Sequence, residues 1–456
     1  MPKKSSRRDF LKSSMVAAGC ASLPAFGAIV PSAVLGANDR INMGFIGVGN
    51  RGSQLLRGFM QQSDVRIAAL CDVYEPYLQR DPSKVHPHFV TELGNNVPKM
   101  GEKFLNVKRF HDFRKLLESK DIDAVCIATP DHWHAIQTIM AMEVDKDVYI
   151  EKPLTITLHE GRKMVEAAKR TARIVQVGLN RRGSSAYQKA VQWVRAGEIG
   201  KVTFARAYRV SNMYPDGIKV MKPENPPEGL DWDMWLGPRA YRPYQYNIAP
   251  YKFRWWSDYS TQMGNWGVHY LDAIRWLAGE KAPSAISAQG GKYFVTDDRT
   301  IPDTMEVTFE FASGLMVVFG IYEATGGNML QKGEVELHGT KAMLAINDRG
   351  YSIEPSRPGQ FQTWSSSKAA IEWKPETPED ITVNLIRNFC DCVKTRQTPD
   401  CPLEEGHRST SFAHLANIAL EMKTRLLWDA EQERFTNHDQ ANDLLHYEYR
   451  KPWALQ

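Results

Sequence analysis

The sequence predicts an α/β protein that begins with a doubly wound parallel sheet and continues with a second, strand-rich α/β domain. Apolar strand-like runs alternate with helix-like runs between residues 41 and 153, which is typical of a parallel sheet. A glycine-rich turn joins the first strand-like run to the first helix-like run. Beyond residue 200, strand-like runs follow one another with turn residues between them, which indicates a separate sheet.

The composition is that of an ordinary globular protein. Of the 456 residues, 43% are hydrophobic and 24% are charged, which excludes collagen-like and mostly disordered chains. The net charge of +4 is too small to indicate a nucleic acid as partner. Residues 1–37 carry five basic residues and one acidic residue, which accounts for the whole of this charge.

Residues 1–37 have the pattern of an export signal. Basic residues come first, a modestly apolar stretch rich in Ala, Ser and Gly follows, and small residues end the segment. The run S-R-R-D-F-L-K at 6–12 resembles the bacterial twin-arginine signal. We therefore expect a periplasmic or otherwise exported protein that uses the twin-arginine machinery. A basic N-terminal arm is the alternative interpretation.

A lipid anchor is a further alternative for this segment. Ala18-Gly19-Cys20 resembles a lipoprotein cleavage site, which would leave Cys20 as the anchored residue. A permanent membrane-spanning helix is disfavoured, because Pro24 and Pro31 interrupt the apolar stretch.

The glycine-rich turn has the G-x-G-x-x-G spacing of dinucleotide-binding proteins and lies between a strand pattern and a helix pattern, as that motif requires. The first glycine permits a tight turn, the second lets the backbone approach a pyrophosphate, and the third allows close helix–strand packing. The N-terminus of the helix then attracts the phosphates. The candidate cofactor contacts here are Gly47, Gly49, Asn50, Arg51 and Gly52.

The second strand-like run, 65–72, ends in Asp72, at the spacing from the glycine turn that ribose recognition requires. An acidic side chain at this point accepts hydrogen bonds from the ribose hydroxyls and repels a 2′-phosphate. The sequence therefore favours NAD over NADP as the cofactor.

Further polar residues follow the ends of the later strand-like runs, 123–129 and 147–153, which alternate with helix-like runs at 113–119 and 136–142. In a doubly wound sheet the ligand binds beyond the carboxyl ends of the strands, so we expect these residues to share one crevice. They are Thr129, Pro130, His132, His134, Glu151 and Lys152.

Four motifs together resemble those of the Gfo/Idh/MocA superfamily of NAD(P)-dependent oxidoreductases. They are the glycine turn, ATPDHWH (128–134), EKP (151–153) and GNWGVHYLD (264–272), within a resemblance that spans 40–420. The resemblance implies a Rossmann domain, 38–178, and an α/β domain, 179–425, whose large, mostly antiparallel sheet has an open face used for oligomerisation. It thus implies a dimer or tetramer, and residues 426–456 are assigned to a C-terminal tail.

The second half of the sequence agrees with this architecture. Helical spacing returns at 380–396 and 406–427, and the Pro- and Trp-rich stretch 223–244 is expected to be an ordered loop. Strand-like runs occupy 201–210, 303–311, 315–324 and 334–346.

The resemblance assigns catalytic roles to Lys152, His269 and the segment around them. His269 is expected to take the hydroxyl proton of an alcohol substrate, while Lys152 binds and polarises the reacting oxygen. The family commonly has Asp four residues before this histidine, whereas this chain has Asn265. An amide binds a sugar hydroxyl but supplies no negative charge. Glu151 and His134 are assigned to the nicotinamide side of the cofactor.

Several residues are candidates for the remaining contacts. Asn180 follows the strand-like run 174–178 and is a candidate cofactor contact. Because aromatic faces stack on sugar C–H groups, and because charged groups bind hydroxyls, four residues are candidates for substrate contacts: Arg181, Tyr208, Trp256 and Asp272. A structural role is the alternative for the last of these.

The cysteines show no spacing typical of a metal site, and we expect no metal. Cys71 and Cys126 lie in apolar runs and are expected to be buried thiols. A disulfide from Cys401 to Cys390 or Cys392 is an alternative in an oxidising compartment.

Three hypotheses for function follow. The leading one is an exported oxidoreductase with tightly bound NAD that acts on a sugar, polyol or glycoside, because no NAD pool is expected outside the cytoplasm. The second is a redox-assisted glycosidase, in which oxidation of the sugar acidifies a neighbouring C–H and elimination then expels the aglycone. The third is a sugar-binding protein that keeps the fold without the chemistry, which Asn265 leaves open.

Overall fold

A computed structural model describes residues 40–93, 106–366 and 368–455. The chain from Arg40 to Gln456 forms one compact unit. The predicted export signal, with Cys20, lies outside the described residues. Within the described ranges, no helix combines the length and the apolar character needed to cross a membrane.

Six parallel strands form the first sheet, in the order β3-β2-β1-β4-β5-β6. This is the strand order of a doubly wound dinucleotide-binding sheet, and it confirms the predicted fold of the first domain. The strands are β1 (Ile41–Ile46), β2 (Val65–Cys71), β3 (Lys108–Phe110), β4 (Ala124–Ile127), β5 (Asp147–Ile150) and β6 (Val175–Val177).

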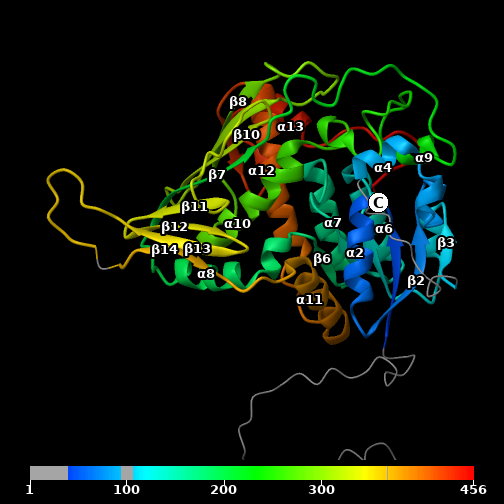
Figure 1. The fold of residues 1–456 in the computed structure, drawn as a ribbon, viewed down its shortest axis with the longest axis horizontal. Helices are drawn as coiled ribbons and strands as arrows, with labels where there is room; N and C mark the ends of the chain where they lie inside the picture. The colour runs from blue at the N-terminus through cyan, green and yellow to red at the C-terminus, as the bar shows by residue number, and fades with distance from the viewer. Residues whose placement is uncertain (1–39, 94–105, 367, 456) are drawn as a thin grey trace, which may run out of the picture. The chain divides into compact units, whose positions relative to one another are not determined.

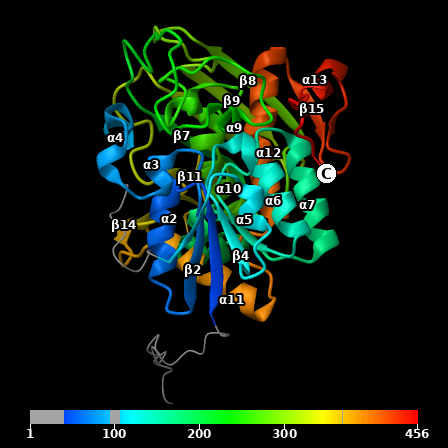
Figure 2. The same ribbon diagram turned by 90° about the vertical axis from the view of Figure 1, so that its right-hand side faces the viewer.

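Helices cover both faces of this sheet, with α2 on one side and α5, α6 and α7 on the other (Figure 2). In β4, Ala124 and Cys126 belong to the core beside α2, while Val125 and Ile127 belong to the core beside α6. Burial on both faces explains why these strands are continuously apolar. The helices are α2 (Asn50–Met60), α3 (Glu75–Leu78), α4 (Pro87–Leu93), α5 (Phe113–Leu117), α6 (His134–Glu143) and α7 (Leu158–Thr171).

Ten strands form the second sheet, in the order β14-β13-β12-β11-β7-β10-β9-β8-β15-β16 (Figure 1). Its pairings are antiparallel except for β7 with β10, as expected for a mostly antiparallel sheet. The strands are β7 (Val202–Val210), β8 (Ala285–Gly291), β9 (Thr304–Glu310), β10 (Met316–Tyr322), β11 (Val335–Gly339), β12 (Ala342–Asn347), β13 (Gly350–Pro355), β14 (Ile371–Pro375), β15 (Leu426–Asp429) and β16 (Arg434–Phe435).

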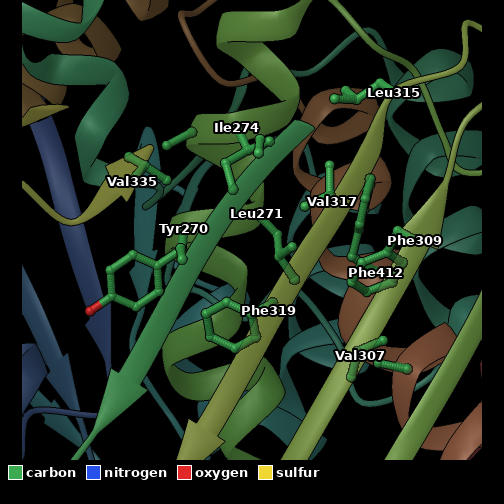
Figure 3. Close-up of a cluster of buried hydrophobic side chains, with 14 of the residues drawn as sticks. Tyr270, Leu271, Ile274, Val307, Phe309, Leu315, Val317, Phe319, Val335 and Phe412 are labelled. Carbon is green, nitrogen blue, oxygen red and sulfur yellow. The ribbon is translucent and has the colours of Figure 1, made fainter. Parts of the chain in front are cut away.

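One face of the second sheet carries an apolar core beneath helices (Figure 3). Val307 and Phe309 of β9 point into this core, and the Phe319 ring stacks on Tyr270 with centroids 5.7 Å apart. The helices of this half are α8 (Ser185–Arg195), α9 (Trp232–Leu236), α10 (Val268–Ala278), α11 (Ile381–Thr395), α12 (Leu403–Met422) and α13 (Asp439–Asp443).

The strand-like run 334–346 is confirmed and forms a hairpin of two strands, β11 and β12, that turns after Gly339. The expected end of the helix at 406–427 was wrong. Helix α12 ends at Met422, because Lys423 takes a left-handed backbone conformation, and Leu426 belongs to β15 and not to a helix. The alternative disulfide does not form among the described residues, because Cys390, Cys392 and Cys401 are free and buried, like Cys71 and Cys126.

The end of the chain returns to the first sheet. Helix α11 packs on α2, and the backbone N–H of Val177 in β6 donates to the carbonyl oxygen of Cys401 over 2.9 Å. The segment predicted as a tail contributes β15 and β16, and the Tyr449 hydroxyl donates to Glu160 of α7 over 2.5 Å.

Candidate active site

The glycine turn closes tightly between β1 and α2. Gly47 has φ +83°, and a Cβ atom there would lie 2.8 Å from the backbone of Ala128 and Thr129. A Cβ atom on Gly52 would overlap the Gly47 carbonyl oxygen, so this glycine allows the helix to pack on the turn. Gly49 is the N-cap residue of α2, and it has no side chain to fill the space in front of the helix end.

Asp72 lies just beyond the end of β2 and is held by the backbone. Its two carboxylate oxygens accept from the N–H groups of Val48, at 2.8 Å, and Tyr74, at 3.0 Å. Burial raises the pKa of Asp72 above its usual value. The nearby Arg80 donates from Nη1 to the Val48 carbonyl oxygen and from Nη2 to the Ser53 hydroxyl, while its Nε has no partner among the described residues.

A cavity of about 440 Å³ opens at the carboxyl ends of these strands and is bounded on its other side by the second domain. That volume lies within the range of small-molecule sites. The structure brings thirteen of the sequence-predicted residues to its lining: Gly47, Gly49, Asn50, Arg51, Asp72, Thr129, Pro130, Glu151, Lys152, Asn180, Arg181, Asn265 and His269.

Lys152 is the central cation of the cavity. Its Nζ donates to the backbone carbonyl of Asn265 over 2.9 Å and to the side-chain Oδ1 of the same residue over 3.1 Å. Burial lowers the pKa of Lys152 to about 8, while the neighbouring Glu151 opposes this shift. The amide that stands where the family commonly has a carboxylate therefore contacts the lysine.

His269 belongs to the first turn of α10 and is 8% exposed. Burial, followed by the positive charges of Arg181, Lys152 and Arg51, holds its pKa well below the usual value. The imidazole is therefore neutral near pH 7. Its Nδ1 is buried without a hydrogen-bond partner among the described residues, so the protein does not fix the tautomer through that atom.

A π-helical turn, Met263–Gly267, precedes α10 and places Asn265 in the cavity wall. Such turns occur frequently at functional sites, because the extra residue reorients the side chains that follow. The backbone N–H of Asn265 donates to the Thr261 carbonyl over 2.7 Å, and its side-chain N–H donates to Gln262 over 3.2 Å.

Two ion pairs line the cavity between the glycine turn and the second sheet. Arg51 donates to Glu151 over 2.8 Å, which joins the start of α2 to the end of β5. Arg181 donates to Glu334 over 2.6 Å, and the Tyr187 hydroxyl donates to the same carboxylate. Each of these arginines is therefore already compensated by a carboxylate.

Two predicted cofactor contacts, His132 and His134, lie behind the cavity and not in its lining. Burial lowers the pKa of His132 to about 3, so its neutral ring donates from Nε2 to the Trp235 carbonyl over 2.9 Å. The ring nitrogens of His134 face the carbonyl oxygens of Pro153, at 2.8 Å, and Thr129, at 2.9 Å. His134 thus supports the ends of two strands, whereas His132 holds helix α9, whose Trp235 lines the cavity.

Three predicted substrate contacts are also displaced from the cavity. Tyr208 lies near Tyr322, with ring centroids 6.3 Å apart, on the sheet face opposite the core. Trp256 is buried and donates to the Asn247 carbonyl over 2.7 Å. Asp272 forms a buried bidentate pair with Arg182, so its alternative, structural role is the one the geometry supports. Gly52 also lies outside the lining and acts through packing.

Sequence reasoning missed other lining residues. Asp131 lines the cavity, and its carboxylate accepts a hydrogen bond from the Ser260 hydroxyl. Because it follows Pro130 in the same motif, its place after a strand end could have predicted it. Tyr251, Arg254 and Trp266 also line the cavity. No local pattern distinguished them from the aromatic residues around them.

The residues of the turn and of β2 fit a bound dinucleotide. The Tyr77 ring, at 3.2 Å, is the only group within 4 Å of a Cβ atom built on Gly49, among the described residues. The rest of the space beside this glycine is open to a pyrophosphate. The Asp72 carboxylate lines the same cavity with lone pairs left for ribose hydroxyls. Within the described ranges, no group of three or more His, Cys, Asp or Glu side chains has the geometry of a metal site.

A doubly wound sheet with this turn, joined to a cavity that contains a half-buried lysine and a neutral histidine, defines a dinucleotide-dependent oxidoreductase. Family comparison agrees. Residues 41–179 match the model described as "Oxidoreductase family, NAD-binding Rossmann fold", and residues 191–335 and 347–455 match "Oxidoreductase family, C-terminal alpha/beta domain". The chain belongs to the Gfo/Idh/MocA oxidoreductase family, and its cofactor is NAD.

Similar proteins extend this result. A glycosyl hydrolase family 109 protein of Shewanella pealeana is 36% identical over 148 residues, which is 32% of this chain and 30% of that protein. A second such protein, from Shewanella baltica, is 30% identical over 44% of this chain and 45% of its own length. This chain thus aligns with less than half of the length of these relatives.

A solved structure with the same fold is the WlbA dehydrogenase of Bordetella pertussis in complex with NADH and UDP-GlcNAcA. It has a TM-score of 0.59 and 17% identity over 86% of this chain and 99% of that one.

Proposed function

We propose that this protein is an exported oxidoreductase that holds NAD tightly and transfers a hydride to or from a hydroxyl-bearing carbon of a sugar, polyol or glycoside. The observation that carries the proposal is the presence of Lys152 and His269 in the cavity that the glycine turn and Asp72 also line. These are a cation for the reacting oxygen and a base for its proton, beside the groups that hold the cofactor.

Lys152 binds and polarises the reacting oxygen. An ammonium group has three N–H donors, and two of those on Lys152 go to Asn265. The third remains for a substrate oxygen. A positive charge at that position stabilises the negative charge that develops on the oxygen when the hydroxyl loses its proton.

His269 takes that proton. Its low pKa keeps the ring neutral, so one nitrogen carries a lone pair at neutral pH. NAD, when bound, would supply the hydride acceptor for the substrate carbon. Asp72 would hold its ribose, and the residues of the glycine turn would hold its pyrophosphate.

A carbohydrate substrate is supported by the lining and by the relatives. Trp266 lines the cavity, and indole rings pack against sugar C–H groups. Among proteins of the same fold, the WlbA structure contains a nucleotide sugar, and an enzyme from Caulobacter crescentus is named an aldose-aldose oxidoreductase.

The test begins with purified protein passed through gel filtration. We expect NAD to remain bound, and we expect a panel of sugars, polyols and glycosides to contain a compound that raises the absorbance of reduced nicotinamide. Lys152→Met and His269→Gln should keep the NAD and lose this reduction. Protein that elutes without NAD, or variants that reduce it as fast as the wild type, would contradict the proposal.

A second candidate function is redox-assisted cleavage of a glycoside, favoured by the relatives named glycosyl hydrolase family 109. Oxidation at C3 makes the C2 proton acidic; loss of this proton and of the aglycone from C1 follows, and water addition and re-reduction complete the cycle. Deuterium from solvent at C2 of the released sugar would support this route. A stable ketosugar without cleavage would favour simple oxidation.

Export through the twin-arginine pathway is part of the proposal and rests on residues 1–37. Replacement of Arg7 and Arg8 by lysine should leave the protein in the cytoplasm, whereas the unchanged chain should reach the periplasm. Cell fractionation with immunodetection measures this. Equal export of both chains would contradict the twin-arginine route.

A further inference from the structure

The guanidinium group of Arg254 differs from the other arginines of the cavity lining. Arg51 and Arg181 each form an ion pair, with Glu151 and Glu334 respectively. Among the described residues, no carboxylate lies within ion-pair distance of Arg254. Arg254 is therefore a half-buried cation without an ion-pair partner among the described residues, and the Asp131 carboxylate acts on it only from beyond that distance.

Aromatic rings hold Arg254 in place. It belongs to the short helix Lys252–Trp255, and its Nη1 donates to the Tyr251 carbonyl over 2.9 Å. Its guanidinium carbon lies 4.3 Å from the ring centroid of Tyr251 and 4.4 Å from that of Phe253. A guanidinium group has five N–H donors, and one of them is used here. The other N–H donors of this planar group remain to bind a ligand.

Arg254 lines the same cavity as Lys152 and His269. Its charge acts on Lys152, whose pKa is lowered first by burial and also by this arginine. It acts as well on Asp131, whose pKa is raised by burial against the effect of neighbouring positive charges. Three cations, Arg51, Lys152 and Arg254, thus face two carboxylates, Asp131 and Glu151. This leaves an excess of one positive charge beside the neutral His269 and Asn265.

We propose that the substrate carries an oxyanion, a carboxylate or a sulfate on the sugar, which binds Arg254 while the reacting hydroxyl lies at Lys152 and His269. This inference rests on the proposed function and narrows its substrate class. A planar guanidinium group matches the two oxygens of such a group in bidentate geometry.

The first test compares matched sugars on the NAD-containing wild-type protein. The pairs are glucose with glucuronate and glucose 6-sulfate, and galactose with galacturonate. A charge-assisted hydrogen bond contributes about 1.5–3 kcal/mol, so we expect an anionic member to exceed its neutral partner in kcat/KM by about tenfold or more. Neutral sugars that react as well as, or better than, every anionic partner would overturn the inference. The carboxylate and sulfate members show which oxyanion is preferred.

Variants locate the selectivity. Arg254→Gln should reduce the anion-to-neutral ratio to near one, and Arg254→Lys should retain part of it. Arg242→Gln is the matched control, because Arg242 stacks on Trp256 outside the cavity and carries the same charge. If Arg254→Gln kept the anion-to-neutral ratio of the wild type, the assignment of the anion site to Arg254 would be overturned. If that variant does not fold, the Arg254→Lys and wild-type ratios decide.

Calorimetric titration of the NAD-containing protein with glucuronate and glucose separates the two proposals, because it requires no turnover. Preferential glucuronate binding that Arg254→Gln abolishes supports the anion site even if none of these sugars is oxidised. Oxidation of neutral sugars without preferential glucuronate binding would overturn the anion site alone. Protein that holds no NAD contradicts the proposed function.

Discussion

The ammonium group of Lys152 donates to the amide oxygen of Asn265 over 3.1 Å, at the position where the family commonly has a carboxylate. Burial lowers the pKa of Lys152 to about 8, and a neutral amide does little to oppose that effect. The lysine therefore changes protonation state close to physiological pH.

Asn265→Asp should raise the pKa of Lys152. A carboxylate within hydrogen-bonding distance favours the charged ammonium form, and opposite charges at such distances shift a pKa upward by about 1 to 3. The limb of the rate profile that lies near pH 8 in the wild type should move to higher pH by a comparable amount. Reduction of bound NAD, followed across pH with one sugar substrate, measures this shift.

A control with the same chemical change is Asn437→Asp, because Asn437 lies in the exposed chain beside β15. Its rate profile should match that of the wild type. An unmoved limb in Asn265→Asp would show that Lys152 does not set it.

His269 should produce no loss of activity as the pH falls through 6.5. Burial holds its pKa well below that usual value, so the ring stays neutral and remains able to accept a proton there. His269→Gln should slow reduction of bound NAD by about 10²- to 10⁴-fold, the usual contribution of a positioned base. Rapid-mixing measurements of the first turnover test both statements, and half-maximal activity near pH 6.5 caused by His269 would refute the first.

Asp72→Asn should weaken the discrimination between NAD and NADP. The amide keeps the size of the side chain but removes the charge that repels a 2′-phosphate. Reconstitution of cofactor-free protein with each dinucleotide, followed by measurement of its dissociation, gives the ratio of affinities. The expected result is a lower ratio through tighter NADP binding and weaker NAD binding, and an unchanged ratio would exclude Asp72 as the determinant.

Asp272→Asn should lower stability more than it lowers the rate of a folded, NAD-containing molecule. The side chains of Asp272 and Arg182 are 1% and 3% exposed and form a direct pair. Removal of one partner of a buried pair typically costs about 3–5 kcal/mol, because the remaining charge stays buried. Glu118→Gln, which removes an exposed helical pair with Lys115, should cost under about 1 kcal/mol. Urea unfolding compares the two, and equal losses would contradict this role for Asp272.

The first domain could be predicted in detail because its signals are local. A glycine spacing between a strand and a helix, with Asp72 at the end of the next strand, fixes the positions that face the cofactor. The wall from the second domain had no such signal. Trp256 and Arg254 are two residues apart, yet one is buried behind the wall and the other lines it, because the approach of that loop depends on long-range packing.

The return of α11 and the start of α12 to the first sheet limits how the gene can be divided. A fragment that stops at residue 178 would retain the entire cofactor turn but would lack the side chains that cover α2 and β6, among them Phe389 and Leu403. Such a truncation would expose apolar surface and aggregate. The NAD-binding domain therefore depends on α11 and α12 of the second domain to cover its apolar core. We expect that neither domain folds stably when it is expressed without the other.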